Sequence, residues 1–291
     1  MNNIYENIFE EVYGYSLEEI DEIKAKSIKE NIITLRSSYR MDNPVTHYDK
    51  DGIRKAYMLC YYPNYSLPAY ELMNNIIIPE LQNNNKKQLK LTFFAAGPAP
   101  EAYGVLMSLN DISFHKKIQV HILDFEKQWE NERKVTSNLL RNMDNLRISE
   151  IKHISGCDLT LECRRGCSNW INCENTVFYG DILFMENCIN HMREEDMFHE
   201  KLKSKISYMQ SGAIFTIIDL DYPNVKNILK QLIVLCNEYV DVIATNIENS
   251  TSQSRLKVNI PDKMKKYIFT GEKDLIEKKN TRYYYLILKR K

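Results

Sequence analysis

A turn of small residues and a nearby acidic residue are the groups in this sequence whose types and spacing best suit small-molecule binding. The apolar run 91–94 has the composition of a buried parallel strand. The turn after it consists of Ala95, Ala96, Gly97 and Pro98. Such a turn lets a ligand approach the backbone closely. A second apolar run, 118–123, ends at Asp124, whose carboxylate is placed to accept two hydrogen bonds from a ribose diol.

The carboxyl ends of the next two predicted strands also carry polar residues. Asp158 and Leu159 follow the third strand, and Glu186 and Asn187 follow the fourth. Because parallel strands present their carboxyl ends at one edge of a sheet, we expect these residues to line the same cleft.

Two further polar residues, Asn190 and His191, come shortly after the fourth strand. The pKa of histidine lies near neutral pH, so His191 could act as a general base. The alternative is a partly exposed histidine at the start of a helix.

A tyrosine-rich segment precedes the first strand. Around Pro63 it contains Tyr61, Tyr62, Asn64 and Tyr65. A buried tyrosine hydroxyl needs a hydrogen-bond partner, so core packing alone does not easily satisfy three of them at one break in the chain. We therefore predict that this segment covers the ligand pocket and contacts a substrate. The alternative is a tyrosine-rich joint between two helices.

Four cysteines lie close together after the third predicted strand. They are Cys157, Cys163, Cys167 and Cys173. Zinc sites of cysteine thiolates usually contain two ligands with two to four residues between them, and only Cys163 and Cys167 have such a spacing here. We expect free thiols in an inserted loop, with a metal site as the alternative.

Alternating strands and helices from residue 88 onward predict a parallel sheet, and a mostly helical segment precedes it. We expect residues 1–87 to form a helical cap and residues 88–291 to form the sheet domain. The strands are expected at 91–94, 118–123, 148–154, 181–185, 212–219, 240–244 and 283–288. The last strand is entered from a long loop without a crossover helix, so it should run antiparallel, in a hairpin with the sixth.

Local signals place the other segments. Ser16 and Glu19 form a capping-box pattern, which predicts a helix from there to about Leu35. Pro63 is expected to end one helix and Pro68 to begin the next. The long polar segment 246–280 is expected to be a lid or a mobile loop.

The turn at 95–98, the acid at 124 and seven strands with the last one reversed resemble the class I S-adenosylmethionine-dependent methyltransferases. The resemblance implies a three-layer, Rossmann-like α/β fold and S-adenosylmethionine as the cofactor. Its methionine part would lie against the turn and its ribose on Asp124. The adenine would lie near Phe125 and Asp158–Leu159, and Glu186 and Asn187 would face cofactor and substrate. The turn has one glycine where a dinucleotide fingerprint has three, which favours a ligand without a pyrophosphate.

The tyrosine-rich segment, with Glu71 after it and the Gly97–Pro100 turn, is similar to nicotianamine synthase. Members of that family transfer the aminobutyrate arm of S-adenosylmethionine, although the spacing of the glutamate differs here. A weaker likeness is to methyltransferase-like assembly factors of the small ribosomal subunit, which carry cysteine ligands for a metal cluster. The three alternatives are therefore methyl transfer, aminobutyryl transfer and a non-catalytic RNA-binding role.

Composition limits the partners. Hydrophobic residues are 44% and charged residues 27% of the 291 residues, which is typical of a globular protein. Lys+Arg and Asp+Glu both number 39, so no strong field draws in RNA or an anionic membrane, although basic residues gather at 278–291. Seven cysteines, an odd number, indicate a reducing compartment such as the cytoplasm. We predict a small-molecule substrate that enters under the N-terminal helices.

Overall fold

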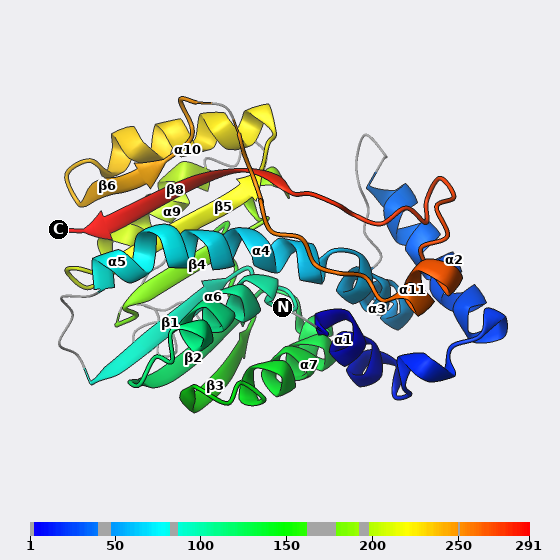
Figure 1. Cartoon of the computed structure of the whole chain (residues 1–291). Helices are drawn as coiled ribbons and strands as arrows, with labels where there is room; N and C mark the ends of the chain where they lie inside the picture. Colours follow the sequence, from blue (N-terminus) through cyan, green and yellow to red (C-terminus); the bar gives the residue numbers. More distant parts are fainter. Residues whose placement is uncertain (1–2, 40–47, 82–86, 162–178, 192–197, 250) are drawn as a thin grey trace.

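One sheet with helices on both faces forms the centre of the computed structural model, which describes residues 3–39, 48–81, 87–161, 179–191, 198–249 and 251–291 (Figure 1). The strands are β1 (Gln88–Phe94), β2 (Lys117–Asp124), β3 (Arg147–Ser155), β4 (Ile182–Glu186), β5 (Ile214–Leu220), β6 (Val240–Thr245), β7 (Ser252–Gln253) and β8 (Arg282–Arg290).

The strand order is β3-β2-β1-β4-β5-β8-β6. The first five strands in this order pair in parallel. Strand β8 lies between β5 and β6 and is antiparallel to both. A mostly parallel sheet with its last strand reversed and helices on both faces is a three-layer, Rossmann-like fold, so the predicted fold class and the reversed last strand are confirmed. The order reverses between β1 and β4, which creates a switch point where ligands of such sheets bind.

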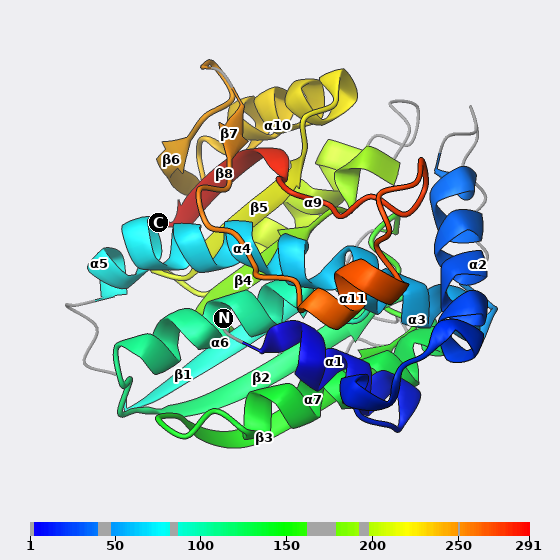
Figure 2. The ribbon, with the colours of Figure 1, turned by 45° about the vertical axis from the view of Figure 1, so that its right-hand side comes forward.

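Each face of the sheet packs against its own apolar core, because successive strand residues point to opposite faces. In β4, Ile182 and Phe184 belong to one core, and Leu183 and Met185 belong to the other. The larger core lies under the helices that precede β4 and includes α11 near the C-terminal end. The smaller core lies under α9 and α10 (Figure 2). The sheet is therefore the middle of three layers.

The helices divide between these layers. On the face of the larger core are α1 (Ile4–Tyr13), α2 (Glu22–Ser38), α3 (Asp51–Cys60), α4 (Tyr62–Leu72), α5 (Ile78–Leu81), α6 (Pro100–Asp111), α7 (Glu130–Arg141) and α11 (Asp262–Tyr267). On the other face are α9 (Phe198–Ser207) and α10 (Pro223–Cys236). A π-helical turn, Met73–Ile77, joins α4 to α5. The N-terminal helices share a core with β1 and β2. The predicted division into two domains at residue 87 stays a prediction.

Helices α4 and α6 lie side by side over the sheet (Figure 1). Their close approach depends on Gly104, since a Cβ atom there would lie 2.0 Å from the carbonyl oxygen of Ser66. That distance is far below van der Waals contact, so only glycine fits without movement of one helix. The contact fixes the N-terminal helices against the first turn of the sheet.

Helix α3 ends at Cys60, before Pro63, as expected, but the expected start of the next helix at Pro68 is wrong. Pro63 lies in the first turn of α4, where its missing N–H costs nothing, and Pro68 lies inside the same helix. The Asn64 carbonyl left without a helical donor by Pro68 accepts from the hydroxyl of Thr281, at 3.5 Å. A distant segment thus satisfies the interior proline, which no local sequence signal could indicate.

The capping box at Ser16 is present, but it caps a 3-10 turn, Leu17–Glu19, and not α2. Helix α2 begins only at Glu22, after Asp21, whose carboxylate accepts from the N–H of Lys24 at 2.8 Å. The predicted start of this helix is therefore wrong by about one turn.

The segment 246–280 is not a simple loop in its described part. It contributes β7, which pairs with β8, and α11, and Met264 and Ile268 are buried in the larger core. The Glu71 carboxylate holds the segment by accepting from the Ser254 hydroxyl at 2.9 Å and from the N–H groups of Arg255 and Leu256. The expectation of a long loop is wrong for the residues of β7 and α11, and a role of the segment as a lid stays a prediction.

Basic residues of β8 and the C-terminus are paired with acids. Arg282 lies 3.1 Å from Asp221, and Lys289 lies 3.0 Å from Glu80. Pairing of this kind reduces the charge left for RNA phosphates. Among the described helices, none combines the length and the apolar character needed to cross a membrane.

Replacing Gly104 by Ala should destabilise the protein by about 1–3 kcal/mol, because overpacking outweighs the gain in helix propensity. Urea unfolding measures the difference. Ser108→Ala on the same helix is the control, since it removes a buried hydroxyl that has no partner among the described residues and should be nearly neutral. Equal stability of Gly104→Ala and wild type would contradict the close contact.

Candidate active site

The turn between β1 and α6 has a strained backbone. Ala95, Gly97 and Ala99 have φ angles of 48°, 51° and 61°, so alternate residues lie in the left-handed region. Alanine in that region costs about 1–2 kcal/mol. The N–H of Ala96 donates to the carbonyl of Leu123 at 3.2 Å, which ties the turn to β2. Strain of this kind concentrates at ligand sites.

Asp124, at the end of β2, holds two turns together. One carboxylate oxygen accepts from the N–H of Gly97 at 2.7 Å, and the other accepts from the N–H of Glu126 at 2.7 Å. Burial raises the pKa of Asp124, and the two N–H donors partly oppose that rise. Each oxygen keeps a lone pair that can accept a further hydrogen bond. The predicted facing of turn and acid is therefore present as a direct contact.

A cavity of about 180 Å³, which we call the acidic cavity, lies at this edge of the sheet. It is lined by Tyr48, Tyr57, Ala95, Ala96, Gly97, Pro98, Pro100, Glu101, Asp124, Glu126, Trp129, Glu186, Asn187 and His191. Four of the lining residues are acidic, and none of the described ones is Lys or Arg. The cavity therefore favours a cationic ligand over an anionic one.

Two buried carboxylates in the acidic cavity lack partners among the described residues. They belong to Glu101, at one oxygen, and Glu186, at both. Burial raises the pKa of both well above the usual range; the charge of Asp124 adds to the rise at Glu101, and the charges of Glu101 and Asp219 add to the rise at Glu186. The amide nitrogen of Asn187 is also without a partner. Buried polar groups are normally hydrogen-bonded, so these atoms are available to bind a ligand.

A second cavity, of about 300 Å³, adjoins the first through Ala95 and Asp124. We call it the outer cavity; its other lining residues are Phe125, Cys157, Asp158, Leu159, Thr160 and Cys188. Phe125 is 57% exposed, so its ring is accessible from the outer cavity. Asp158 accepts from the N–H and the hydroxyl of Thr160, at 2.8 and 2.6 Å, and so holds its own turn.

A third cavity, of about 400 Å³, lies under the N-terminal helices. We call it the tyrosine cavity; it is lined by Tyr39, Tyr48, Tyr57, Tyr61, Tyr65, Asn187, Asn190, His191, Leu220, Tyr222, Asn224 and Lys278. It shares Tyr48, Tyr57, Asn187 and His191 with the acidic cavity. These four residues form the boundary at which a ligand in one cavity meets a ligand in the other.

Asp219, at the end of β5, positions the segment after β4. Its carboxylate accepts from the N–H groups of Ile189, Asn190 and Leu220, at 2.6, 3.3 and 2.8 Å. Burial raises the pKa of Asp219 to about 7, although these donors oppose the rise. With its nitrogen facing the acceptors, the Asn190 amide also donates to Asp219 at 3.1 Å. Asn187 and His191 are thereby held at the boundary between the cavities.

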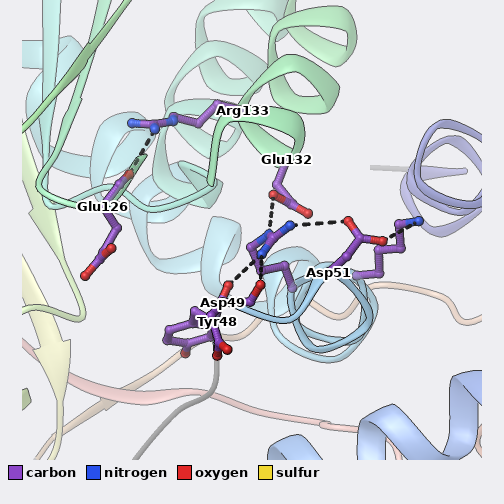
Figure 3. Close-up of polar contacts among 8 residues, drawn as sticks. Tyr48, Asp49, Asp51, Glu126, Glu132 and Arg133 are labelled. Carbon is purple, nitrogen blue, oxygen red and sulfur yellow. Dashed lines mark hydrogen bonds and ion pairs between the residues drawn. The ribbon is translucent and has the colours of Figure 1, made fainter. Parts of the chain in front are cut away.

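Arg54, on α3, positions Tyr48. Its guanidinium donates to the carbonyls of Tyr48 and Asp49, at 2.6 and 3.1 Å, and to the carboxylate of Glu132 on α7, at 3.1 Å (Figure 3). Arg54 and Glu132 are both buried. The buried pair therefore connects α3 and α7 and fixes the backbone that carries one wall of the cavities.

The structure brings most of the sequence-predicted residues to these cavities. The acidic cavity includes Ala95, Ala96, Gly97, Pro98, Asp124, Glu186, Asn187 and His191; the outer cavity includes Phe125, Asp158 and Leu159; and the tyrosine cavity includes Tyr61, Tyr65 and Asn190. Their roles in binding stay predictions.

Two predicted substrate residues do not line any of the three cavities. The Tyr62 hydroxyl pairs with that of Thr136 at 3.0 Å inside the core. The amide nitrogen of Asn64 donates to the Tyr5 hydroxyl at 3.4 Å, also in the core. Both face away because α4 is one continuous helix that presents only one side to the cavities.

Sequence reasoning missed Glu101, Tyr48, Tyr57, Trp129 and Lys278. Glu101 follows Pro100 and so has the pattern of an ordinary first-turn acid of a helix. The others reach the site from separate segments, and nothing in their local patterns places them together.

Three of the four clustered cysteines, Cys163, Cys167 and Cys173, lie outside the described residues. Cys157 has a free thiol and lines the outer cavity. No group of metal-binding side chains occurs in the part of the chain that the structure describes.

No family model and no curated protein matches this chain. Among solved structures, it is similar to a protein from Listeria monocytogenes assigned to the class I S-adenosylmethionine-dependent methyltransferases, at 11% identity over 100% of this chain and 88% of that one, with a TM-score of 0.49. It is also similar to the N-methyltransferase NodS from Bradyrhizobium japonicum, in complex with S-adenosyl-L-homocysteine, at 7% identity over 89% and 98%, with a TM-score of 0.42.

A third similar structure is that of a protein from Streptococcus mutans assigned to the S-adenosylmethionine-dependent methyltransferases, at 9% identity with a TM-score of 0.43. The match covers 73% of this chain and 47% of that protein, so this chain spans about half of its length. These similarities concern the fold alone.

Replacing Glu186 by Gln should change how stability depends on pH. In the unfolded chain this carboxyl ionises near pH 4.3, whereas its folded pKa is higher, so the folded state binds more protons between the two values. The free energy of unfolding of the wild-type protein therefore falls as pH rises through this range. Glu186→Gln has no carboxyl group at this position, so its free energy of unfolding does not fall for this reason. Its free energy of unfolding relative to wild type should rise by about 1–2 kcal/mol from pH 5.5 to 8.

Urea unfolding at several pH values measures this difference. Glu10→Gln, at an exposed position on α1, is the control for the loss of one acidic side chain. A difference between Glu186→Gln and wild type that stays constant with pH would contradict a raised pKa at Glu186.

Proposed function

We propose that this protein is an S-adenosylmethionine-dependent methyltransferase whose cofactor lies along the carboxyl edge of the sheet. The observation that carries the proposal is the acidic cavity, with three buried carboxylates beside the strained turn. S-adenosylmethionine bears a sulfonium and an ammonium group, so it suits a cavity with unpartnered carboxylates. A dinucleotide would place its pyrophosphate charges against the same acids.

The described residues fit this cofactor by their chemistry. The free oxygens of Glu101 and Glu186 would lie against the ammonium and sulfonium groups of the cofactor. The amide nitrogen of Asn187 would donate to the cofactor's own carboxylate. The remaining lone pairs of Asp124 would accept from the ribose hydroxyls. The exposed ring of Phe125 and the side chain of Leu159 would contact the adenine in the outer cavity. When bound, the cofactor supplies an electrophilic methyl group on a sulfonium leaving group.

The chain's own contribution is orientation and exclusion of water. Residues at the boundary of the acidic and tyrosine cavities would align a nucleophile with the cofactor, which is a large source of rate acceleration. His191 lies at this boundary, and neutral imidazole there would accept a proton from the substrate. The tyrosine side chains that line the tyrosine cavity would keep bulk water away from the reacting groups.

Aminobutyryl transfer is a second candidate, because Tyr61 and Tyr65 line the cavity next to the proposed cofactor site. Glu71, part of the same resemblance, instead holds the 254–256 segment and lines a different groove. Product analysis separates the candidates: methyl transfer yields S-adenosylhomocysteine, and aminobutyryl transfer yields methylthioadenosine.

Calorimetry with S-adenosylmethionine and NAD tests the cofactor site. We expect wild type to bind S-adenosylmethionine with micromolar affinity and NAD not detectably. Asp124→Asn should weaken this binding by about 10- to 100-fold, because a hydrogen bond to a charged group contributes about 1.5–3 kcal/mol. Asp144→Asn, at an exposed position, is the matched control.

Thermal unfolding of Asp124→Asn should accompany the titration, since this side chain also anchors two backbone turns. A folded Asp124→Asn variant with wild-type affinity would remove Asp124 from the site. Binding of NAD but not S-adenosylmethionine by wild type would overturn the proposed function.

A further inference from the structure

The tyrosine cavity contains one lysine among otherwise uncharged or weakly charged groups. Apart from His191, Lys278 is the only basic residue in its described lining, and no Asp or Glu lines it. The charged side chain in the lining of the tyrosine cavity is therefore opposite in sign to those of the adjoining acidic cavity. A molecule in the tyrosine cavity meets a cation, whereas one in the acidic cavity meets carboxylates.

Lys278 has aromatic neighbours but no anionic partner among the described residues. Its ammonium lies 4.6 Å from the ring centre of Tyr65 and 5.4 Å from that of Tyr61, and 3.5 Å from the Tyr65 hydroxyl. Desolvation lowers the pKa of Lys278 to about 8, with a contribution from Arg36, while Glu186 acts in the opposite sense. An ammonium in these surroundings gains from an anion more than a fully solvated one does.

Arg36 holds the backbone that carries Lys278. Its guanidinium donates to the carbonyls of Asp274 and Ile276, at 2.9 and 2.5 Å. The ammonium is therefore presented by an anchored segment, and its place beside the two tyrosine rings is defined. An anchored cation at a cavity wall is suited to orient a ligand.

The other walls suit a flat or apolar body. The rings of Tyr61 and Tyr65 are stacked, with centres 5.6 Å apart and planes 14° from parallel. Tyr57 packs against both rings, at 5.5 and 6.3 Å between centres. Aromatic faces of this kind bind apolar and planar groups, whereas tyrosine hydroxyls and Asn224 supply hydrogen bonds at the edges.

From this arrangement we propose that the tyrosine cavity binds the acceptor as a small organic carboxylate with a planar or apolar body. Lys278 binds the carboxylate, the tyrosine rings cover the body, and the nucleophilic end points toward Asn187 and His191. The proposal rests on the proposed function, because it assigns the substrate class of that same site. In this proposal Lys278 determines which charge the acceptor must carry.

Binding of matched acids and amides tests this proposal. The probes are benzoate, 4-hydroxybenzoate and 3-phenylpropionate, each compared with its primary amide, and inorganic phosphate as an anion without a body. Calorimetry or competition by NMR measures their affinities, with and without saturating S-adenosylhomocysteine. In wild type at pH 7, at least one acid should bind 10-fold or more tightly than its amide and than phosphate.

Lys278→Met should abolish this preference and leave the affinity of the amide unchanged. Lys278→Arg should keep the preference, because it keeps the charge. Lys279→Met is the matched control: its side chain is 69% exposed, it lies 3.7 Å from Glu277, and it should behave as wild type. S-adenosylmethionine binding by Lys278→Met shows that the variant is folded.

The proposal is overturned if no acid binds more tightly than its amide, if none binds at all, or if Lys278→Met keeps the preference. Failure of the proposed function gives a different result, since wild type would then not bind S-adenosylmethionine whether or not it prefers acids. Tighter binding of phosphate than of every acid would show a simple anion site and would also overturn the assignment of an organic carboxylate.

Discussion

The pair of hydrogen bonds accepted by Asp124 is the interaction on which the rest of the site depends. It joins the turn after β1 to the turn after β2, so both strand ends keep a fixed separation. The left-handed backbone at Ala95 and Ala99 persists because the surrounding contacts determine it. From this junction α6 departs with Glu101 in its first turn, which is how an acid from the helix reaches the same cavity as one from β4.

Two cavities of opposite charge then meet at four residues. The acidic cavity is built on the sheet edge, whereas the tyrosine cavity is roofed by helices of the N-terminal part and by the segment that carries Lys278. Buried groups that line neither cavity support the residues of both: Arg54 with Glu132, and Asp219, which holds the segment after β4. The structure thus separates the residues that would touch ligands from those that position them.

Sequence patterns predicted the sheet well, because alternation and buried apolar runs are local and each strand carries its own signal. They also predicted the turn at 95–98 and the acid at 124, since both follow directly from strand ends. They failed where the deciding partner is remote. Pro68 is tolerated in α4 because Thr281 supplies a donor, and Lys278 reaches the tyrosines through a segment fixed by Arg36. Such contacts leave no periodicity in the chain.

The carboxyl groups of the acidic cavity that lack partners affect how its ligand binding depends on pH. Burial favours the protonated forms of Glu101 and Glu186, whereas a cationic ligand favours the same oxygens without protons. Hydrogen ions and the ligand therefore compete for one pocket. Acidification would therefore weaken the binding of a cationic ligand.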